Sequence, residues 1–465
     1  MDLTREADRE VLRAHLGGLY AGRPVLVGPG VLAGFVSTVR MLREVGAGPI
    51  LILSTGRGAG EVPDVEVVEV TPPVTTSVTA EMRALDGLVR DLPPDVVDRI
   101  EAFDPDRLAI WCTLPFVSTD EPILGRPVTG GRPAAFAALE DKIWVEELWA
   151  TVGIPRATSH VVPPTREALD EASEALGGEV VWSGDTREGF NGGGNYVRWV
   201  ATPEERAAAL PFFAEHCDRV RVLPFLDGVP CSIHGAVLPE GTAVFRPVEI
   251  AILRGPDRSF TYGGLSTFWD PPAADREEMR DVARRVGEHL RTTRGYAGMF
   301  GIDGVLTADG FRPTELNPRM SAGAAAVVAS VDRQLFLLLQ ANLVAGREPG
   351  VSVRELESGL PLMDRVRIGK PVAVGETKTL GGTFSYPVAW DGTRLSRATE
   401  DTGTVLEVGD TPTGFFARLE PCRVLRPGDR LAPLNVALTA YLDREYDAGF
   451  GPLTPAPSLR GPVDP

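Results

Sequence analysis

Lysine is nearly absent from this chain of 465 residues, because only Lys142, Lys370 and Lys378 stand among its 47 basic side chains. The bias is typical of a GC-rich genome and indicates no particular fold, but it makes each lysine a candidate for a specific role. An excess of positive charge is also missing, since the net charge is −17. Nucleic-acid-binding proteins usually have a basic balance, so this composition disfavours a nucleic-acid partner.

Signals for metal centres and membrane spans are missing as well. The four cysteines form no CxxC pair, so we expect buried thiols in a reducing cytoplasm rather than a zinc site or a redox motif. The five histidines are far apart and show no metal-ligand spacing. No apolar run reaches the roughly 20 residues of a membrane-spanning helix. The charged segment MDLTREADRE lacks a signal-peptide core, so we expect a soluble cytoplasmic protein without a membrane partner.

The composition is that of a large globular protein of mixed α/β and α+β structure. Hydrophobic residues make up 43% of the chain, and 51 glycines indicate many turns. Strand, glycine turn, helix and strand patterns follow one another over 24–54, which predicts an α/β domain over 1–132. Alternating strands and helices predict a second domain over 133–350. Short strands predict a β-rich domain with a mobile tail over 351–465.

Three helices are predicted in the second domain from apolar periodicity. The first covers 133–153 and contains Lys142, which a helix would normally expose to solvent. The second covers 273–294 and is amphipathic, with a charged outer face. The third covers 330–346 and is apolar enough to pack inside the protein.

The segment 300–323, FGIDGVLTADGFRPTELNPRMSAG, contains the strongest functional pattern. A hairpin centred on Asp309 would place Asp303 and Glu315 opposite each other on one face of a sheet, and Asn317 would join that face. Opposed carboxylates destabilise a hairpin unless a cation lies between them. Three oxygen ligands on one face suit Mg²⁺, which shares its coordination with phosphates and water.

Two further segments favour a nucleotide. The loop in GDTREGFNGGGNYVRWV (184–200) lies between two apolar strands, and its glycines would allow backbone N–H groups to cover phosphates. A flexible hairpin turn is the alternative interpretation. In VLPFLDGVPCSIHGAVL (222–238), a short link joins two apolar strands, and such a cleft can receive an adenine against its backbone groups.

In this order and spacing, these segments and Lys142 resemble the ATP-grasp superfamily over residues 133–330, with 1–132 similar to the pre-ATP-grasp domain of that family. The full layout, including the tail domain and GFNGGG, resembles the actinobacterial peptide ligases of antibiotic biosynthesis, of the pheganomycin type. The resemblance implies that ATP is held by Lys142, by Gly192, Gly193 and Gly194 of the flap, and by Pro224 and Leu226 of the adenine linker. It implies Asp303, Glu315 and Asn317 as Mg²⁺ ligands and Arg319 as the residue that steadies the transferred phosphoryl group.

The sequence departs from the family pattern at the nucleotide. A second lysine usually ends the strand before the flap, where this chain has Trp182 and Ser183, and Arg187 is one substitute for its charge. Leu223 replaces the usual acid of the linker. The usual ribose-binding acid near position 230 is also missing, so the metal contacts are better supported than those to adenine and ribose.

The resemblance implies an ADP-forming ligase that joins a carboxylate, such as an amino acid, to the amine of an amino acid or peptide through an acyl phosphate. Another ATP-grasp ligase or carboxylase and a non-catalytic ATP-binding regulator are the alternatives, and a homodimer is left open. The segment 252–272 reads as a long mobile loop at the acceptor site. Its Arg254, as a catalytic-site residue, and Arg258 would bind a substrate carboxylate there.

Overall fold

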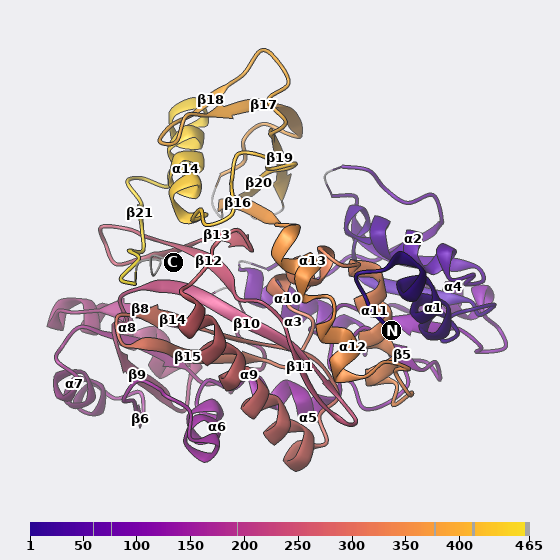
Figure 1. The fold of residues 1–465 in the computed structure, drawn as a ribbon, viewed down its shortest axis with the longest axis horizontal. Helices are drawn as coiled ribbons and strands as arrows, with labels where there is room; N and C mark the ends of the chain where they lie inside the picture. The colour runs from indigo at the N-terminus through magenta and orange to yellow at the C-terminus, as the bar shows by residue number, and fades with distance from the viewer. Residues whose placement is uncertain (59, 76, 193, 376–377, 412–413, 461–465) are drawn as a thin grey trace.

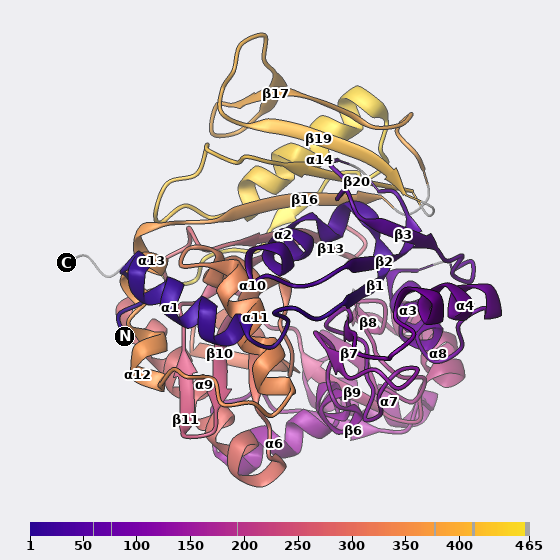
Figure 2. The same ribbon diagram turned by 90° about the vertical axis from the view of Figure 1, so that its right-hand side faces the viewer.

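The computed structural model describes residues 1–58, 60–75, 77–192, 194–375, 378–411 and 414–460, and these form three β-sheets with helices between and around them (Figure 1). Figure 2 shows strands of the C-terminal region with helix α14 at the top, and the N-terminal strands and the four-stranded sheet below them. The mixed α/β and α+β class predicted from the sequence is confirmed. Within these ranges, no helix has both the length and the apolar character needed to cross a membrane.

The N-terminal sheet has five parallel strands in the order β3-β2-β1-β4-β5. The strands are β1 (Val25–Val31), β2 (Ile50–Gly56), β3 (Glu66–Glu69), β4 (Ile110–Cys112) and β5 (Val128–Thr129). The helices are α1 (Glu6–Gly17), α2 (Val36–Glu44, after a 3₁₀ turn at Leu32–Phe35), α3 (Val78–Leu88) and α4 (Pro94–Phe103). The predicted βαβ unit is β1–α2–β2, whose apolar strands VLV and ILIL are buried as parallel strands require.

A four-stranded antiparallel sheet of order β6-β9-β7-β8 follows. Its strands are β6 (His160–Val162), β7 (Val180–Gly184), β8 (Val197–Val200) and β9 (Val220–Pro224). Helices α7 (Arg166–Ala175) and α8 (Pro203–His216) supply residues to the same core. Trp182 and Phe213 lie in this core, so the neighbouring Ser183 of β7 points to the opposite face.

The large sheet has twelve strands, with the path β15-β14-β10-β12-β13-β16-β20-β19-β17-β18 and with β11 and β21 at the side. Its first strands are β10 (Val229–Leu238), β11 (Gly241–Val244), β12 (Val248–Arg254), β13 (Phe260–Ser266), β14 (Gly298–Thr307) and β15 (Gly310–Asn317). The later strands are β16 (Gly369–Gly375), β17 (Phe384–Trp390), β18 (Leu395–Arg397), β19 (Val405–Thr411), β20 (Gly414–Leu419) and β21 (Thr454–Pro455).

Helices cover both faces of this sheet. Helix α9 (Ala273–Arg294) lies across β10, β14 and β15 in Figure 1, and its buried Met279, Val286 and Leu290 form a core with Ile302. Helices α10 (Ala322–Ala329) and α11 (Arg333–Val344) belong to the core on the other side. The helices predicted over 273–294 and 330–346 are thus confirmed. The remaining helices are α12 (Val353–Glu357), α13 (Leu360–Arg365) and α14 (Ala432–Tyr446).

The predicted helix over 133–153 is wrong as a single element. The chain forms α5 (Ala134–Ala137), a 3₁₀ turn at Ala138–Glu140, and α6 (Trp144–Val152). The break arises at Asp141, whose carboxylate accepts the N–H groups of Ile143 at 2.6 Å and Trp144 at 3.3 Å. Such a side chain starts a new helix rather than continuing the old one. Lys142 therefore lies in a turn and is buried, with 6% exposure, instead of facing solvent from a helix.

The structure bears on two other expectations. The long loop predicted over 252–272 is corrected, because this segment contains the β12–β13 hairpin and only 255–259 form its loop. The tail was predicted to be mobile, and its described residues 451–460 contact the rest of the protein. In that segment β21 pairs with β12, and Arg460 forms an ion pair of 2.9 Å with the buried Asp275.

Candidate active site

Two carboxylates face each other on the β14–β15 hairpin, as predicted, but a bulge rather than the turn produces the pairing. The turn pairs Thr307 with Gly310, a register that would place Asp303 opposite Thr314 if it continued. The register shifts at Asp303, so that Thr314 is the extra residue and Glu315 becomes the partner of Asp303. The Thr314 hydroxyl donates to the Asp303 carbonyl at 3.2 Å, and its own carbonyl accepts from Arg221 at 2.8 Å.

Negative charge at this hairpin exceeds the positive charge that contacts it. Lys142 Nζ lies 3.0 Å from Glu315 Oε2 and balances one carboxylate. Asn317 Nδ2 donates to Asp303 Oδ2 at 3.0 Å, which is a neutral contact. Burial and then the Glu315 charge raise the pKa of Asp303 above its ordinary value, and Arg319 opposes them only in part. The pair therefore favours the approach of a cation.

Arg319 is held in one place by a second buried carboxylate. Its Nε contacts Glu140 Oε1 at 2.7 Å, and its Nη2 donates to Asn317 Oδ1 at 2.9 Å. Arg132 contacts the other oxygen of Glu140 at 2.8 Å. Although burial acts against it, the Glu140 charge raises the pKa of Arg319, and Glu315 and Asp303 add to the effect. The guanidinium thus remains charged beside the hairpin.

The glycine-rich loop between β7 and β8 lies over this arginine. The Phe190 ring is 5.4 Å from the Arg319 guanidinium carbon and 6.0 Å from that of Arg132. Arg83 of α3 holds the loop from the N-terminal side, since it donates to the Phe190 carbonyl at 2.8 Å and the Gly189 carbonyl at 3.3 Å. The loop therefore covers the hairpin side of the site.

The predicted flap glycines belong to this loop, between Phe190 and β8. The Thr79 hydroxyl of α3 donates to the Gly192 carbonyl. Gly194 has a φ of +76°, a conformation that glycine adopts without strain. Gly193, which was predicted to join them, lies outside the described residues.

The link between β9 and β10 has the features that an adenine contact requires. Pro224 ends β9, and the Phe225 N–H donates to the Glu179 carbonyl at 3.0 Å, which fixes the start of the link. Within the described part of the chain, the Leu226 N–H makes no hydrogen bond. Leu226 is only half-buried, so this donor remains for a ligand.

A buried arginine occupies the position where the strand before the flap lacks a lysine. Arg221 of β9 is paired directly with Ser183 of β7 and is 1% exposed. Its Nη1 contacts Glu146 at 3.0 Å, and its Nε has no hydrogen-bond partner among the described residues. Arg187, the substitute considered from the sequence, instead forms ion pairs with Asp218 and Glu188. Cross-strand pairing, which sequence reasoning did not consider, identifies Arg221.

Arg254 and Arg258 lie at the tip of the β12–β13 hairpin, where they form ion pairs with residues other than Asp303 and Glu315. Arg254 contacts Asp227 at 2.8 Å and lies over the Phe225 ring at 4.9 Å. Arg258 pairs with Glu205 of α8. The structure thus brings Arg254 to the β9–β10 link, while Lys142, Asp303, Glu315, Asn317 and Arg319 come together around the hairpin.

The residues present fit a magnesium ion bound together with a nucleotide. Two carboxylates supply oxygen ligands, and the Asn317 carbonyl keeps a second lone pair besides the one that accepts from Arg319. Across the described ranges, no group of three or more histidine, cysteine or acidic side chains is placed to hold a metal. Phosphate oxygens and water would therefore complete the coordination of a metal at this site.

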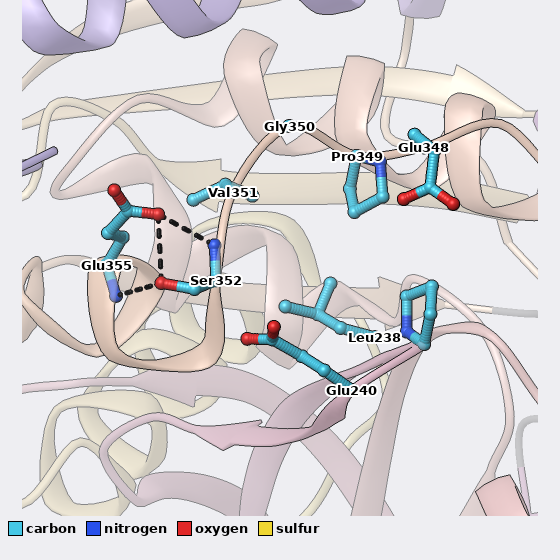
Figure 3. A pocket seen from close by; sticks show the side chains of 9 residues that line it. Leu238, Glu240, Glu348, Pro349, Gly350, Val351, Ser352 and Glu355 are labelled. Atoms are coloured by element: carbon cyan, nitrogen blue, oxygen red, sulfur yellow. Dashed lines mark hydrogen bonds between the residues drawn. The ribbon is translucent and has the colours of Figure 1, made fainter.

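A separate hollow of about 320 Å³ lies between the β10–β11 turn and the segment before α12 (Figure 3). Its acids serve the local backbone: Glu355 accepts from the Ser352 N–H at 2.8 Å, and Glu240 accepts from the Val353 N–H at 2.8 Å. None of the predicted site residues lines it. This hollow is explained by helix capping rather than by a ligand.

The sequence matches no protein-family profile and no curated protein. Solved structures are similar over nearly the whole chain. An L-amino acid ligase from Bacillus licheniformis is 14% identical, with a TM-score of 0.51 and coverage of 94% of this chain and 99% of that one. A carboxyaminoimidazole ribonucleotide synthase from Aspergillus clavatus, complexed with ATP, is 12% identical, with a TM-score of 0.50 and coverage of 91% and 99%. This chain therefore shares its overall fold with these two proteins.

Proposed function

We propose that this chain is an ADP-forming carboxylate–amine ligase that uses Mg·ATP and makes an amide bond through an acyl phosphate. The observation that carries the proposal is the Asp303–Glu315 pair, which lacks one positive charge and lies beside Lys142 and Arg319. The similarity in fold to an amino acid ligase and to a synthase complexed with ATP supports the same chemistry.

Each residue then has one task. Leu226 N–H and the Pro224 carbonyl bind adenine, and the glycine loop with Gly192, Gly193 and Gly194 covers the phosphates. Asp303, Glu315 and Asn317 would hold Mg²⁺, which would neutralise charge on the phosphates. Lys142 would contact a phosphate from its place beside Glu315. Arg221 supplies the buried charge that a second lysine provides elsewhere.

The reaction needs no nucleophile from the protein. A carboxylate oxygen of the acid substrate attacks the γ-phosphorus, and the bond to ADP breaks. The amine nitrogen then attacks the acyl carbon, loses a proton, and inorganic phosphate leaves. Arg319, which Glu140 and Asn317 hold in place, stabilises the negative charge of the phosphoryl group during both steps. Phe190 and the loop limit the access of water, which would otherwise hydrolyse the acyl phosphate.

We further propose that the substrates are an amino acid or a derivative and an amino acid or peptide, in a specialised biosynthesis such as that of a peptide antibiotic. The three units 1–132, 133–350 and 351–465 would act together, with the first holding the flap through Arg83 and the last contributing to the acceptor side. The printed name of the amino acid ligase similar in fold supports this substrate class.

The test is a screen of amino acids and short peptides for amine-dependent ADP formation with Mg·ATP. The expected products are ADP and phosphate, separated by chromatography, and AMP as the main product would contradict the mechanism. ATP binding without amine-dependent turnover would identify a regulator, and turnover that depends on bicarbonate would identify a carboxylase. Glu315→Gln is the inactive control for the same preparation.

A further inference from the structure

The three lysines of the chain have three different environments. Lys142 pairs with Glu315 in the candidate active site. Lys378 is exposed and forms an ion pair of 2.8 Å with Asp447. Lys370 of β16 is half-buried, and within the described residues no carboxylate lies within 4.0 Å of its ammonium group and no hydrogen bond reaches it. An ammonium group partly removed from water without a partner is costly, so its position needs an explanation.

Lys370 lines a cavity of about 230 Å³ between β16 and β20. Arg418 of β20 and Glu420, which follows that strand, line it too, and Arg418 is already paired with Glu420 at 3.2 Å and with Glu407 at 2.7 Å. Phe416, which is 38% exposed, forms an apolar wall of the same cavity. The cavity therefore offers an unused ammonium group beside an apolar surface.

A second unused cation acts on Lys370. Burial and then the Arg333 charge lower the pKa of Lys370, while Glu420 acts in the opposite direction. Arg333 begins α11, its described contact is a hydrogen bond of 3.3 Å to Ser37 Oγ, and burial lowers its pKa as well. Arg333 and Lys370 repel each other, and Glu420, whose charge raises the pKa of both, offsets this repulsion in part, so a further anion beside Lys370 would offset the rest.

The strand register places Lys370 on the same face of the large sheet as Asp303. Directly paired residues point to the same side of a sheet, as do residues two apart on one strand. The pairs are Asp303↔Ser232, Ser232↔Val248, Ile250↔Leu265 and Leu265↔Lys370. Four steps between strands, each about 4.8 Å, separate Asp303 from Lys370 by about 19 Å.

A row of half-buried and exposed side chains crosses the sheet between Asp303 and Lys370. Val248 and Leu265 are buried under α10, as members of the same core. The adjacent row on this face consists of Ile250, Tyr262 and Val372, which are half-buried or exposed, and Val372 lines the cavity. Burial, and next the charge of Asp303, raise the pKa of Tyr262 to about 12, so Asp303 acts on this tyrosine electrostatically.

We propose that the cavity around Lys370 binds the C-terminal carboxylate of a peptide whose amino group reacts beside Asp303 and Glu315, with Tyr262 and Val372 along its path. This proposal rests on the proposed ligase function and specifies the amine substrate of that reaction as a peptide. An extended chain covers about 3.3–3.6 Å per residue, so a span of about 19 Å fits a peptide of about five to six residues. The Phe416 wall favours an apolar side chain at the C-terminal residue.

The small number of lysines allows a direct test on the unmodified protein. Acetic anhydride would acetylate Lys142, Lys370 and Lys378, and mass spectrometry of proteolytic fragments would give a rate for each. Ala-Ala-Ala-Ala-Phe with a free carboxylate should slow acetylation of Lys370 at least about threefold, as a charge-assisted contact would, while the same peptide with a C-terminal amide should not. Lys378 is the exposed reference in every sample, and its rate should stay constant.

The other outcomes of labelling contradict the proposal. Equal protection by the acid and the amide, or none beyond that of sodium chloride at the same ionic strength, would overturn it. Inorganic phosphate is the third probe. Stronger protection of Lys370 by phosphate than by the free-acid peptide would assign the cavity to a phosphate group and overturn the carboxylate.

Kinetics test the same idea through turnover. Lys370→Gln should raise the acceptor KM for the free-acid peptide about tenfold, the loss expected for a hydrogen bond to a charged group, and should leave kcat and the ATP KM near their original values. Lys378→Gln is the matched control and should change nothing. An amidated acceptor should show the same KM with both variants, and a raised KM for the amide would contradict a carboxylate contact. If no peptide supports ADP formation, the proposed function fails, whereas the labelling still decides whether the cavity binds a carboxylate.

Discussion

Two hairpins of the large sheet carry charged residues, and they use them differently. On β14–β15, Asp303 and Glu315 face each other, and among the described residues only Lys142 forms an ion pair with them. On β12–β13, Arg254 pairs with Asp227 and Arg258 pairs with Glu205, so both arginines have an opposite partner. Both hairpins have the same antiparallel pairing and lie in one sheet, so the backbone does not account for the difference.

The difference indicates where a ligand belongs. A hairpin whose charges are paired stabilises the fold, because each contact is complete without another molecule. A hairpin with excess charge on a buried face loses stability in the empty protein and regains it when a cation binds. Substitutions in β14–β15 should therefore affect turnover far more than folding, and substitutions in β12–β13 should do the reverse.

The largest effect is expected for Glu315→Gln. This change keeps the shape of the side chain but removes one of the two charges that hold the metal, so turnover should fall by about 10³ or more. The melting temperature without Mg·ATP should change little, because relief of the repulsion with Asp303 offsets the loss of the ion pair with the buried Lys142. Turnover and melting curves with and without Mg·ATP are the measurements.

Glu277→Gln on the exposed side of α9 is the matched control and should alter neither quantity. Near-normal turnover of Glu315→Gln, or a loss explained by unfolding, would make the hairpin structural and remove the contrast between the two hairpins.

Arg319→Ala should have the next largest effect. The guanidinium is expected to contact the transferred phosphoryl group, so kcat should fall by about 10² while ATP affinity changes only a few-fold. Arg312→Ala on the same strand is the control, because the hydrogen bonds of Arg312 within the described chain go to carbonyls of the turn region. Steady-state kinetics and calorimetric titration with ATP separate the two quantities, and a loss confined to ATP affinity would show that Arg319 binds the nucleotide alone.

The pH dependence should reveal the raised pKa of Asp303. A metal needs this carboxylate deprotonated, so Mg²⁺ affinity should fall as the pH falls through its folded pKa, by up to about tenfold per pH unit for one linked proton. The fall should begin above the ordinary carboxylate range, since burial and Glu315 raise the pKa. Titration of Mg·ATP binding over a pH series measures it.

The stability of the metal-free protein should change with pH in the opposite direction to the Mg²⁺ affinity. Because the pKa of Asp303 is higher in the folded state, its contribution to stability is present at low pH and is lost as the pH rises through the folded value. Asp303→Asn cannot titrate, so its melting temperature relative to the original protein should increase with pH. A constant difference across the series would show that Asp303 is not perturbed.

The opposed carboxylates were predictable from the sequence because the pattern is local. Asp303 and Glu315 are twelve residues apart on one hairpin, so a turn nearly fixes their relation. The predicted pairing of Asp303 with Glu315 is correct, but it depends on the bulge at Thr314, which the sequence periodicity does not indicate. The βαβ unit and the long helix α9 were predictable for the same reason, since their apolar spacing is contained within the segment itself.

The rest of the site depends on contacts between distant segments. Glu140 acts on Arg319 from 179 residues away, and Arg221 is placed by its pairing with Ser183. The face on which Lys370 lies follows only from the register of five strands. The β12–β13 hairpin was read as a loop because glycines and arginines obscure its alternation, although its Phe260 stacks on Trp199, which also stacks on Phe225.

The smallest effect is expected for Arg254→Ala, which tests the paired hairpin. Arg254 contacts Asp227 at 2.8 Å and the Phe225 ring at 4.9 Å, and a partly exposed ion pair with a cation–π contact contributes about 1 kcal/mol at most. The melting temperature of the variant should therefore be slightly lower. Because Phe225 precedes Leu226 in the link, the ATP KM should rise a few-fold, whereas the role predicted from the sequence would raise the KM of the acid or peptide instead.

Arg258→Ala is the matched control, since it removes the other cation of the hairpin at a contact with α8 rather than with the link. Equal effects of both variants on one substrate KM would mean that the hairpin binds that substrate directly and that its charges are not purely structural.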